Sequence, residues 1–422
     1  MSLQSSTTAL PALVLALRAG PANATSELLA SDKDTPAHCV PTTGRRAPTR
    51  AVDVQPVSSR RELTRWIRFP YSIYPADGQW VPPLERELRR RLSPRNPYFR
   101  HGEARAFLAL EQGRVRGRIL AHVNRKHIEA HGERVAFFGY FECDDDPWVA
   151  RGLFDAASSF AREHGCDRLR GPFNMTAYQE LGILLQGFDR SHSVGETHTA
   201  PYYPRLLQAA GLQPCKHIST FLNPDLQQLD PQSLLGARFQ QLPQQTEITV
   251  RTVDLRHYKR EVLGLGQILN ACFEGNWHYV PLSDDEVRFD YGGLKPVLRS
   301  DLVLVAEHHG EPVGFAICMP DVYQLLRPMR GRLSIRGLLR FQQGRDRLRQ
   351  ACLLTIGVRP EHRRGGVIRL LLHQLVHTLQ RLGYTSLTGT WVGDDNEASL
   401  AQTRALGMVR KHRLAIYEGR VD

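Results

Sequence analysis

One stretch of the sequence, residues 351–381, constrains the fold more than any other part of the chain. It begins with an apolar run over residues 351–358, which is typical of a buried strand. Residues 359–366 then hold a proline, three arginines and two adjacent glycines, a composition that predicts a tight loop. From Val367 onward apolar residues recur at helical spacing, with arginine and histidine on the opposite face. The stretch therefore predicts a strand, a basic glycine loop and an amphipathic helix in direct succession.

The predicted loop is suited to an anionic ligand. Gly365 and Gly366 let the backbone turn sharply and approach a ligand closely. The N–H groups of the first helical turn point into the loop, and the helix dipole favours negative charge there. Arg363 and Arg364 add positive charge, so a phosphate or pyrophosphate is the expected ligand. The motifs of a Walker loop and of a dinucleotide fingerprint are absent, and an ordinary strand–turn–helix with basic loop residues is the alternative.

The spacing Val-x-Pro-x-x-Arg-x-x-Gly-Val, from Val358 to Val367, resembles the acyl-CoA pyrophosphate loop of the GNAT N-acyltransferase superfamily. The resemblance spans roughly residues 248–419 and implies acyl-CoA as co-substrate. One position departs from the family, because Ile368 stands where a glycine or alanine is usual. Its side chain either narrows the phosphate site or turns toward the core. The residues expected to contact acyl-CoA are Ile356, Gly357, Val358, Arg363, Arg364, Gly365, Gly366, Val367, Ile368 and Asn396.

The segment after the loop and helix supports the same resemblance. Residues 385–392 are expected to form the next strand, and Asn396 and Gly407 follow it eleven residues apart, as in the family. Residues 408–417 are expected to form a closing pair of short strands. Thr403 stands where many family members carry a tyrosine that serves as general acid. Cofactor binding is therefore better supported by the sequence than catalysis.

The N-terminal half repeats the order of elements of the C-terminal half. A predicted hairpin (residues 104–123), strand (135–141), helix (148–164) and strand (168–172) follow one another. At the place of the glycine loop this half has Cys-Asp-Asp-Asp-Pro, residues 143–147. Three carboxylates at a helix N-terminus stabilise the helix and repel a pyrophosphate. The expected fold is therefore α/β with a mixed sheet, in two tandem GNAT-like domains of which the N-terminal copy is degenerate.

The expected domain organisation has four parts, and it places the whole second copy after a linker. The parts are a disordered N-terminal tail (1–50), an N-terminal GNAT-like domain without a pyrophosphate loop (51–224), a linker (225–246) and a C-terminal GNAT N-acyltransferase domain (247–422). Residues 171–189 resemble one branch of two-domain bacterial GNAT proteins, some of which are linked to N-acylation of sphingoid bases. A lipid amine is therefore a conceivable acceptor.

The resemblance implies direct attack of a neutral amine on the thioester, so a base must accept the proton of the amine. Since the usual tyrosine is missing, the sequence leaves several candidates for the base or acid open. Glu142 would make the degenerate copy contribute to chemistry, and the others lie in the C-terminal copy. The four candidates are Glu142, His278, Glu286 and Asp395. The seven cysteines are scattered without close pairs, which argues against a zinc site and for a reducing compartment; no metal is expected.

The chain is basic, with a formal net charge of +12, and its charge is concentrated in one segment. Residues 325–350 contain eight arginines and one aspartate. Such an insert can lie on an anionic membrane surface, steer the phosphates of CoA, or form a solvated face of its own domain. Nucleic acid is not favoured, because the basic residues are not interleaved with aromatics. The expected location is the cytoplasm, with contact to the inner face of the membrane through this insert.

Three functional hypotheses follow. The first is an N-acyltransferase that moves an acetyl or longer acyl group from acyl-CoA to a primary amine in a ternary complex. The second is a tandem enzyme that acts on a lipid amine such as a sphingoid base, or that takes its group from aminoacyl-tRNA. The third is a catalytically silent module that senses CoA or binds nucleic acid. The sequence carries no signal for the acyl chain length or the oligomeric state.

Overall fold

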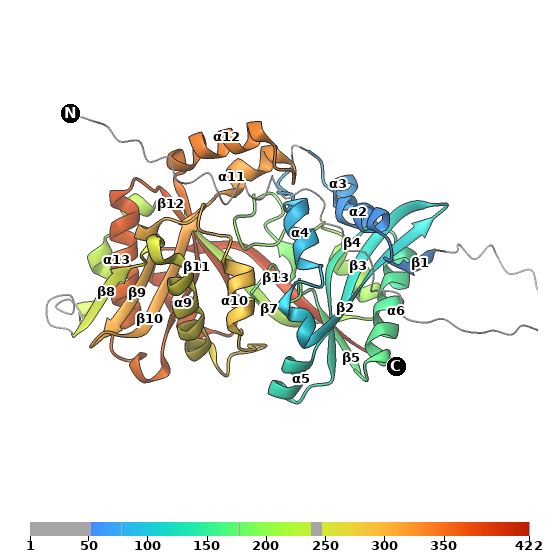
Figure 1. Cartoon of the computed structure of the whole chain (residues 1–422), viewed down its shortest axis with the longest axis horizontal. Coiled ribbons are helices and arrows are strands. Elements are labelled where there is room, and N and C mark those ends of the chain that lie inside the picture. Colours follow the sequence, from blue (N-terminus) through green and yellow to red (C-terminus); the bar gives the residue numbers. More distant parts are fainter. Residues whose placement is uncertain (1–51, 77, 177, 238–246, 422) are drawn as a thin grey trace, which may run out of the picture. The chain divides into compact units, whose positions relative to one another are not determined.

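A computed structural model describes residues 52–76, 78–176, 178–237 and 247–421, and Figure 1 shows its fold. From Val52 onward the chain forms one compact unit. The expected disordered tail (1–50) and part of the expected linker (238–246) lie outside the described residues. The domain boundaries proposed from the sequence stay predictions.

The described residues form a mixed sheet of 13 strands, in the order β1-β2-β3-β4-β5-β13-β7-β12-β11-β10-β9-β8, with β6 beside β13. The strands of the N-terminal half are β1 (Asp53–Pro56), β2 (Gly102–Glu111), β3 (Arg114–Asn124), β4 (Val135–Cys143), β5 (Arg168–Gly171), β6 (Ile183–Gln186) and β7 (Gln213–Asn223). Those of the C-terminal half are β8 (Ile248–Thr252), β9 (Val303–His308), β10 (Glu311–Pro320), β11 (Gln350–Val358), β12 (Ser386–Gly393) and β13 (Val409–Arg420).

The helices cover this sheet in the same order in both halves. The N-terminal half contains α2 (Arg60–Arg68), α3 (Pro70–Ile73), α4 (Glu85–Arg91), α5 (Arg125–His131), α6 (Pro147–Glu163) and α7 (Tyr203–Ala209). The C-terminal half contains α9 (Tyr258–Phe273), α10 (Asp284–Tyr291), α11 (Tyr323–Leu326), α12 (Ile335–Gly344), α13 (Val367–Arg381) and α14 (Glu397–Ala405). A hairpin, a strand, a helix and a parallel strand recur as β2-β3-β4-α6-β5 and as β9-β10-β11-α13-β12. The predicted duplication of a mixed α/β fold is confirmed.

The last strand of each half pairs with the other half. β7 lies beside β12, whereas β13 lies between β5 and β7. The prediction of two short closing strands over residues 408–417 is wrong, because β13 is a single strand that runs on to Arg420. It stays extended because it has a partner on each side: β5 and β6 on one edge and β7 on the other. This exchange of the last strands joins the two copies into one continuous sheet.

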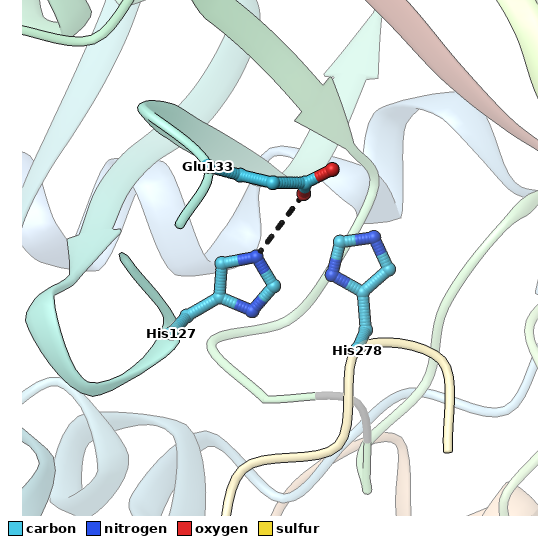
Figure 2. Close-up of side chains that lie close together, drawn as sticks. All are labelled: His127, Glu133 and His278. Atoms are coloured by element: carbon cyan, nitrogen blue, oxygen red, sulfur yellow. Dashed lines mark ion pairs between the residues drawn. The ribbon is translucent and has the colours of Figure 1, made fainter. Parts of the chain in front are cut away.

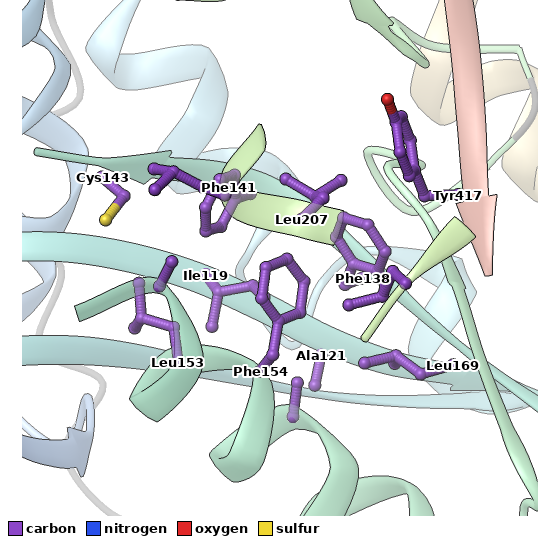
Figure 3. Close-up of a cluster of buried hydrophobic side chains, with 14 of the residues drawn as sticks. Ile119, Ala121, Phe138, Phe141, Cys143, Leu153, Phe154, Leu169, Leu207 and Tyr417 are labelled. Atoms are coloured by element: carbon purple, nitrogen blue, oxygen red, sulfur yellow. The ribbon is translucent and has the colours of Figure 1, made fainter. Parts of the chain in front are cut away.

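The core of the N-terminal half therefore includes residues from the C-terminal end of the chain. Tyr417 of β13 belongs to the same buried cluster as Phe138, Leu169 and Leu207, and Figure 3 shows it at the edge of this cluster. The helix α6 packs against this core and begins at Pro147; its N-cap is Asp146, whose carboxylate accepts a hydrogen bond from Trp148 N–H at 3.0 Å. An aspartate before a proline in the first turn is a strong helix start, so the acidic loop of this copy acts as a cap.

Candidate active site

The predicted glycine loop joins β11 to α13. A single helical turn (Pro360–His362) follows β11, and α13 begins after Gly366, which has a φ of 77° and gives no side-chain cap. A residue with a Cβ is strained at this φ, so the glycine serves the turn. Leu370 N–H donates to Gly366 O at 3.0 Å, and the N–H groups of Val367 and Ile368 precede that first helical bond. They face the loop, as an anion site at a helix N-terminus requires.

Three of the residues predicted to contact acyl-CoA have packing roles as well. Arg363 donates from Nη2 to Cys272 O at 2.9 Å, which ties the loop to the end of α9. Ile368 packs partly buried against the core beneath α13, so its side chain turns inward. A Cβ on Gly357 would lie about 3 Å from Phe315, Cys272 and Phe273, so glycine lets α9 pack closely on β11.

The opening beside β11 is the feature that suits an extended ligand. β11 and β12 pair only from Gln350 to Leu353, and the two strands separate beyond that point. Arg359 N–H donates to Val313 O of the neighbouring hairpin at 2.9 Å. Since successive residues of a strand face opposite neighbours, the backbone groups of Ile356 and Val358 face the opening. Leu354 O points the same way, because Thr390 Oγ1 donates to it at 2.8 Å. An open strand edge thus leads to the N-terminus of α13.

The corresponding edge in the N-terminal copy is closed. The backbone N–H of Cys143, at the end of β4, donates to the hydroxyl of Tyr203 at 3.1 Å. Glu142 is buried there, and its Oε2 accepts hydrogen bonds from Tyr74 at 2.8 Å and Tyr203 at 2.6 Å. Burial raises the pKa of Glu142, and Arg118 nearby opposes this shift. This candidate base is therefore held within the core of its own copy.

A loop of the N-terminal copy, residues 193–196, lies at the opening beside β11, and sequence reasoning missed it. A Cβ on Gly195 would lie 3.3 Å from Thr390 and 3.7 Å from Leu354. The loop is anchored by a buried ion pair between Glu196 Oε2 and Lys411 Nζ at 2.6 Å. The only available signal was a polar run without periodicity, and its partner is 215 residues away along the chain.

Two predicted residues at the end of β12 are occupied by structural contacts. Asp395 is exposed and forms an ion pair with Lys216, whose hydrogen bond holds the pKa of that carboxyl below its usual range. Asn396 caps α14, since its side chain accepts a hydrogen bond from Ser399 N–H at 3.1 Å. Their assignment to catalysis and to cofactor binding stays a prediction.

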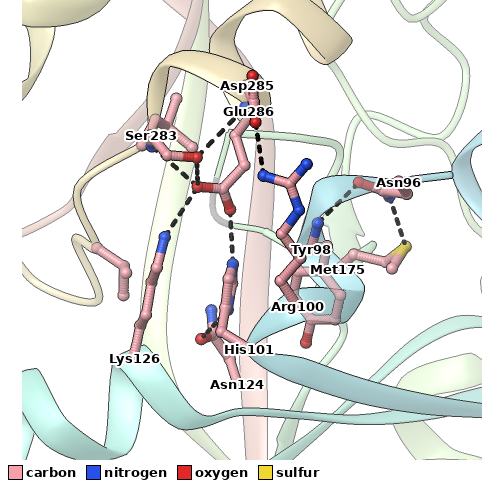
Figure 4. Close-up of polar contacts among 12 residues, drawn as sticks. Asn96, Tyr98, Arg100, His101, Asn124, Lys126, Met175, Ser283, Asp285 and Glu286 are labelled. Atoms are coloured by element: carbon pink, nitrogen blue, oxygen red, sulfur yellow. Dashed lines mark hydrogen bonds and ion pairs between the residues drawn. The ribbon is translucent and has the colours of Figure 1, made fainter. Parts of the chain in front are cut away.

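The other two predicted catalytic residues, His278 and Glu286, line one cavity of about 40 Å³ between the two copies, together with His122 and His127. Glu286 Oε1 lies 2.7 Å from His101 Nε2, and Oε2 lies 2.9 Å from Lys126 Nζ (Figure 4). Burial opposes this charge, but hydrogen bonds from His101, Ser283 and Lys126 hold the pKa of Glu286 well below its usual range. Glu286 thus links α10 to the N-terminal copy as a carboxylate.

His278 stands at a φ of 55°, which is uncommon for a residue with a side chain. Arg170 Nη1 lies 2.5 Å from its Nε2, and a guanidinium can only donate. Nε2 is therefore the acceptor, and the proton of the neutral ring is on Nδ1. Burial, reinforced by the nearby His127 and Arg170, lowers the pKa of His278 to about 2. Burial likewise lowers the pKa of His127 to about 4.

His127, Glu133 and His278 lie close enough to share a metal ion, as Figure 2 shows. Within the described part of the chain, His278 Nδ1 has no hydrogen-bond partner, and His127 Nε2 lies 3.5 Å from Glu133 Oε2. Arg170 Nη1, however, already lies 2.8 Å from Glu133 Oε2. A divalent cation would have to displace this guanidinium, so the cluster is better suited to hydrogen-bonding a neutral polar group than to a metal.

Comparison with known proteins relates the chain to one family. Residues 263–408 match the model of the acetyltransferase (GNAT) family. Protein YghO of Escherichia coli is 27% identical over 377 residues, which cover 86% of this chain and 94% of that protein. A bacterial ceramide synthase of Caulobacter vibrioides is 28% identical over 375 residues, covering 87% and 97%. A tandem GNAT protein from the clavulanic acid biosynthesis pathway has a similar fold, with a TM-score of 0.53 at 14% identity over 88% of this chain and 99% of that one.

Proposed function

We propose that this chain, a GNAT-superfamily protein with two tandem copies of the fold, is an N-acyltransferase that moves an acyl group from acyl-CoA to a primary amine. The observation that carries the proposal is the open edge of β11, which leads to the uncapped N-terminus of α13. The equivalent edge of β4 is closed by Tyr203. The copy that contains β11 therefore offers an unpaired strand edge and a helix N-terminus to a ligand, and in the other copy the equivalent edge is closed.

In this proposal each feature of the opening has one role. The pyrophosphate lies at Gly366 and Val367, and the pantetheine arm pairs with the backbone of Ile356 and Val358. A backbone N–H on that edge donates to the thioester oxygen as negative charge develops there. The amine nitrogen forms the new bond to the carbonyl carbon, the C–S bond breaks, and CoA leaves as the thiol after it takes up a proton.

The proton of the amine has no obvious protein acceptor among the four candidates. The Glu142 carboxylate accepts two tyrosine hydroxyls, the accepting nitrogen of His278 is held by Arg170, and Glu286 is engaged by His101 and Lys126. Asp395, paired with Lys216, is a weak base because its pKa is lowered. We therefore propose that the proton leaves through water at the open edge, after the amine has bound in its neutral form.

The acceptor we favour is a long-chain amine such as a sphingoid base. The support is the resemblance to a bacterial ceramide synthase over 87% of this chain. Aminoacyl-tRNA as the donor of the transferred group is less favoured, because the predicted pyrophosphate loop is intact.

The proposal is tested by ligand-dependent thermal stability and by release of the CoA thiol. Long- and short-chain acyl-CoA should each raise the melting temperature of the parent protein. Gly366→Asp should abolish this rise, because a carboxylate about 4 Å from a phosphate costs on the order of 4 kcal/mol at the protein surface. Thiol release with a sphingoid base as acceptor should fall in parallel.

The matched control is Gly113→Asp, since Gly113 has the same φ of 77° but lies in the β2–β3 turn with nothing near its Cβ position. Gly113→Asp reproduces the backbone strain of Gly366→Asp but places no charge in the glycine loop before α13. If acyl-CoA raises the melting temperature of Gly366→Asp as much as that of Gly113→Asp, the loop does not bind the pyrophosphate and its assignment is refuted. Binding without thiol release for any amine would favour a CoA sensor.

A further inference from the structure

The helix α12 carries apolar side chains on the outside of the molecule. Ile335 is 72% exposed and Leu339 is 52% exposed, although both are large aliphatic residues. They are four residues apart, so they form one ridge on the helix. Figure 1 shows α12 at the margin of the fold, above β11 and β12. Exposed apolar ridges of this kind mark surfaces that meet a partner.

The helix is held firmly by its other side. Phe341 is buried in a cluster with Met319, Val322 and Leu348. Gly337 packs against Met329, and Ser334 caps the first turn by accepting a hydrogen bond from Gly337 N–H at 3.0 Å. The outward position of the ridge is therefore a property of the folded helix, since its inward face is already filled.

Arginines flank the ridge, and few acidic groups neutralise them. Arg336 and Arg340 are exposed, and the described residues provide no ion-pair partner for either. Arg332 forms an ion pair with Glu85, and Asp346 is the one acidic residue of the segment 325–350. An apolar ridge beside unpaired guanidinium groups is complementary to the boundary between acyl chains and phosphates of an anionic bilayer.

The same segment lies next to the open edge of β11. Leu325, Leu326 and Met329 belong to the apolar cluster that also contains Leu354 and Val194. Leu354 marks the point where β11 and β12 separate. Whatever binds the exposed ridge of α12 therefore also lies close to the opening beside β11. Among the described residues no helix is long and apolar enough to cross a bilayer.

We propose that α12 docks on an anionic lipid bilayer, with Ile335 and Leu339 inserted among the lipids and Arg336 and Arg340 on the headgroup phosphates. Docking delivers a membrane-resident amine to the edge of β11, and this second part rests on the proposed acyl transfer. The docking itself does not depend on it.

Co-sedimentation with vesicles tests the docking. The parent chain should bind vesicles of phosphatidylcholine with phosphatidylglycerol and should not bind phosphatidylcholine alone. The double variant Arg336→Gln/Arg340→Gln should bind ~30-fold more weakly. Ile335→Ser/Leu339→Ser should lose at least as much, because the ridge no longer gains from leaving water. The matched controls are Arg60→Gln/Arg61→Gln on the exposed face of α2 and Val409→Ser, whose side chain is 56% exposed.

The outcomes separate docking from catalysis. Gly366→Asp should bind vesicles as the parent does while losing acyl transfer. The proposal is wrong if the parent binds vesicles equally well with and without anionic lipid. It is also wrong if both double variants bind vesicles as well as the parent does. If RNA competes with vesicles and the serine variant binds both as well as the parent does, the surface is a general polyanion site and the proposal is wrong. Vesicle binding without any acyl transfer would count against the enzyme and not against the docking.

Discussion

Lowering the pH should unfold this protein through the cavity between its two copies. Three of its histidines are buried and neutral: burial lowers the pKa of His122 and of His127 to about 4, and that of His278 to about 2. In the unfolded chain a histidine titrates near 6.5. Because the folded values are lowered, the contribution to stability is fully present above pH 6.5. It is lost as the pH falls toward 4, where the unfolded chain binds protons that the folded chain cannot accept.

The size of this loss of stability follows from the difference in the number of protons bound by the unfolded and the folded chain. Each such histidine should reduce the free energy of unfolding by about 1 kcal/mol as the pH falls from 6 to 5. At pH 5 the three together amount to about 6 kcal/mol, a large part of the stability of a typical domain. Glu286 lines the same cavity, and Glu133 forms an ion pair with Arg170 next to His278. Both carboxyls have lowered pKa values, so the stability that they contribute is lost only below the pH where a carboxyl ordinarily titrates, near 4.5.

Urea unfolding followed by circular dichroism at a series of pH values measures this slope. His278→Gln should lower the slope between pH 6 and pH 5 by about one third, because one of the three protons is removed. His257→Gln, at an exposed histidine outside the cavity, shows how much of the effect belongs to the substitution itself. A free energy of unfolding that is unchanged from pH 7.5 to pH 5 would refute the reasoning, since it would mean that these imidazoles are not buried in the folded protein.

Two further substitutions probe the packing around the open edge. Lys411→Met leaves Glu196 buried without its cation and should reduce the free energy of unfolding by about 3–5 kcal/mol. Adding Glu196→Gln should restore most of this free energy. If the single and the double variant are equally unstable in urea, the pairing of Lys411 with Glu196 is contradicted. Gly357→Ala places a Cβ about 3 Å from Phe315, Cys272 and Phe273 and should cost about 1–3 kcal/mol. Gly293→Ala, whose Cβ meets nothing within 4 Å, is its control, and equal melting temperatures of the two variants would show that α9 does not pack as described.

Elements with strong local signals could be predicted from the sequence. The hairpins β2–β3 and β9–β10, and the succession of β11, loop and α13, follow from periodicity and turn residues that lie next to one another along the chain. The same holds for the acidic cap of α6, because an N-cap acts within its first turn. These signals need no knowledge of which segments meet in space.

The pairing of β13 could not be predicted in this way. An apolar strand can pair with any strand that has a free edge. Its sequence pattern therefore predicts its extended conformation but not which strands it pairs with. The cavity between the copies has the same origin. His278 and Glu286 were candidates because of their loop, but His122 and His127 come from β3 and the start of α5, more than 140 residues earlier in the chain. These segments meet only where the two copies pack against each other in the folded chain.

The exchange of the last strands also ties the N-terminal copy, which has no glycine loop, to the opening of the C-terminal copy. β13 completes the sheet and the core of the N-terminal copy, while β7 completes the sheet beside the opening of the C-terminal copy. The N-terminal copy further supplies the loop 193–196, which lies against Thr390 and Leu354. The surroundings of the open edge of β11 are therefore built by residues of both halves. Of the three carboxylates that stand at the place of the glycine loop in the N-terminal copy, Asp146 caps α6, whereas Asp144 and Asp145 form ion pairs with Arg116 and Arg205.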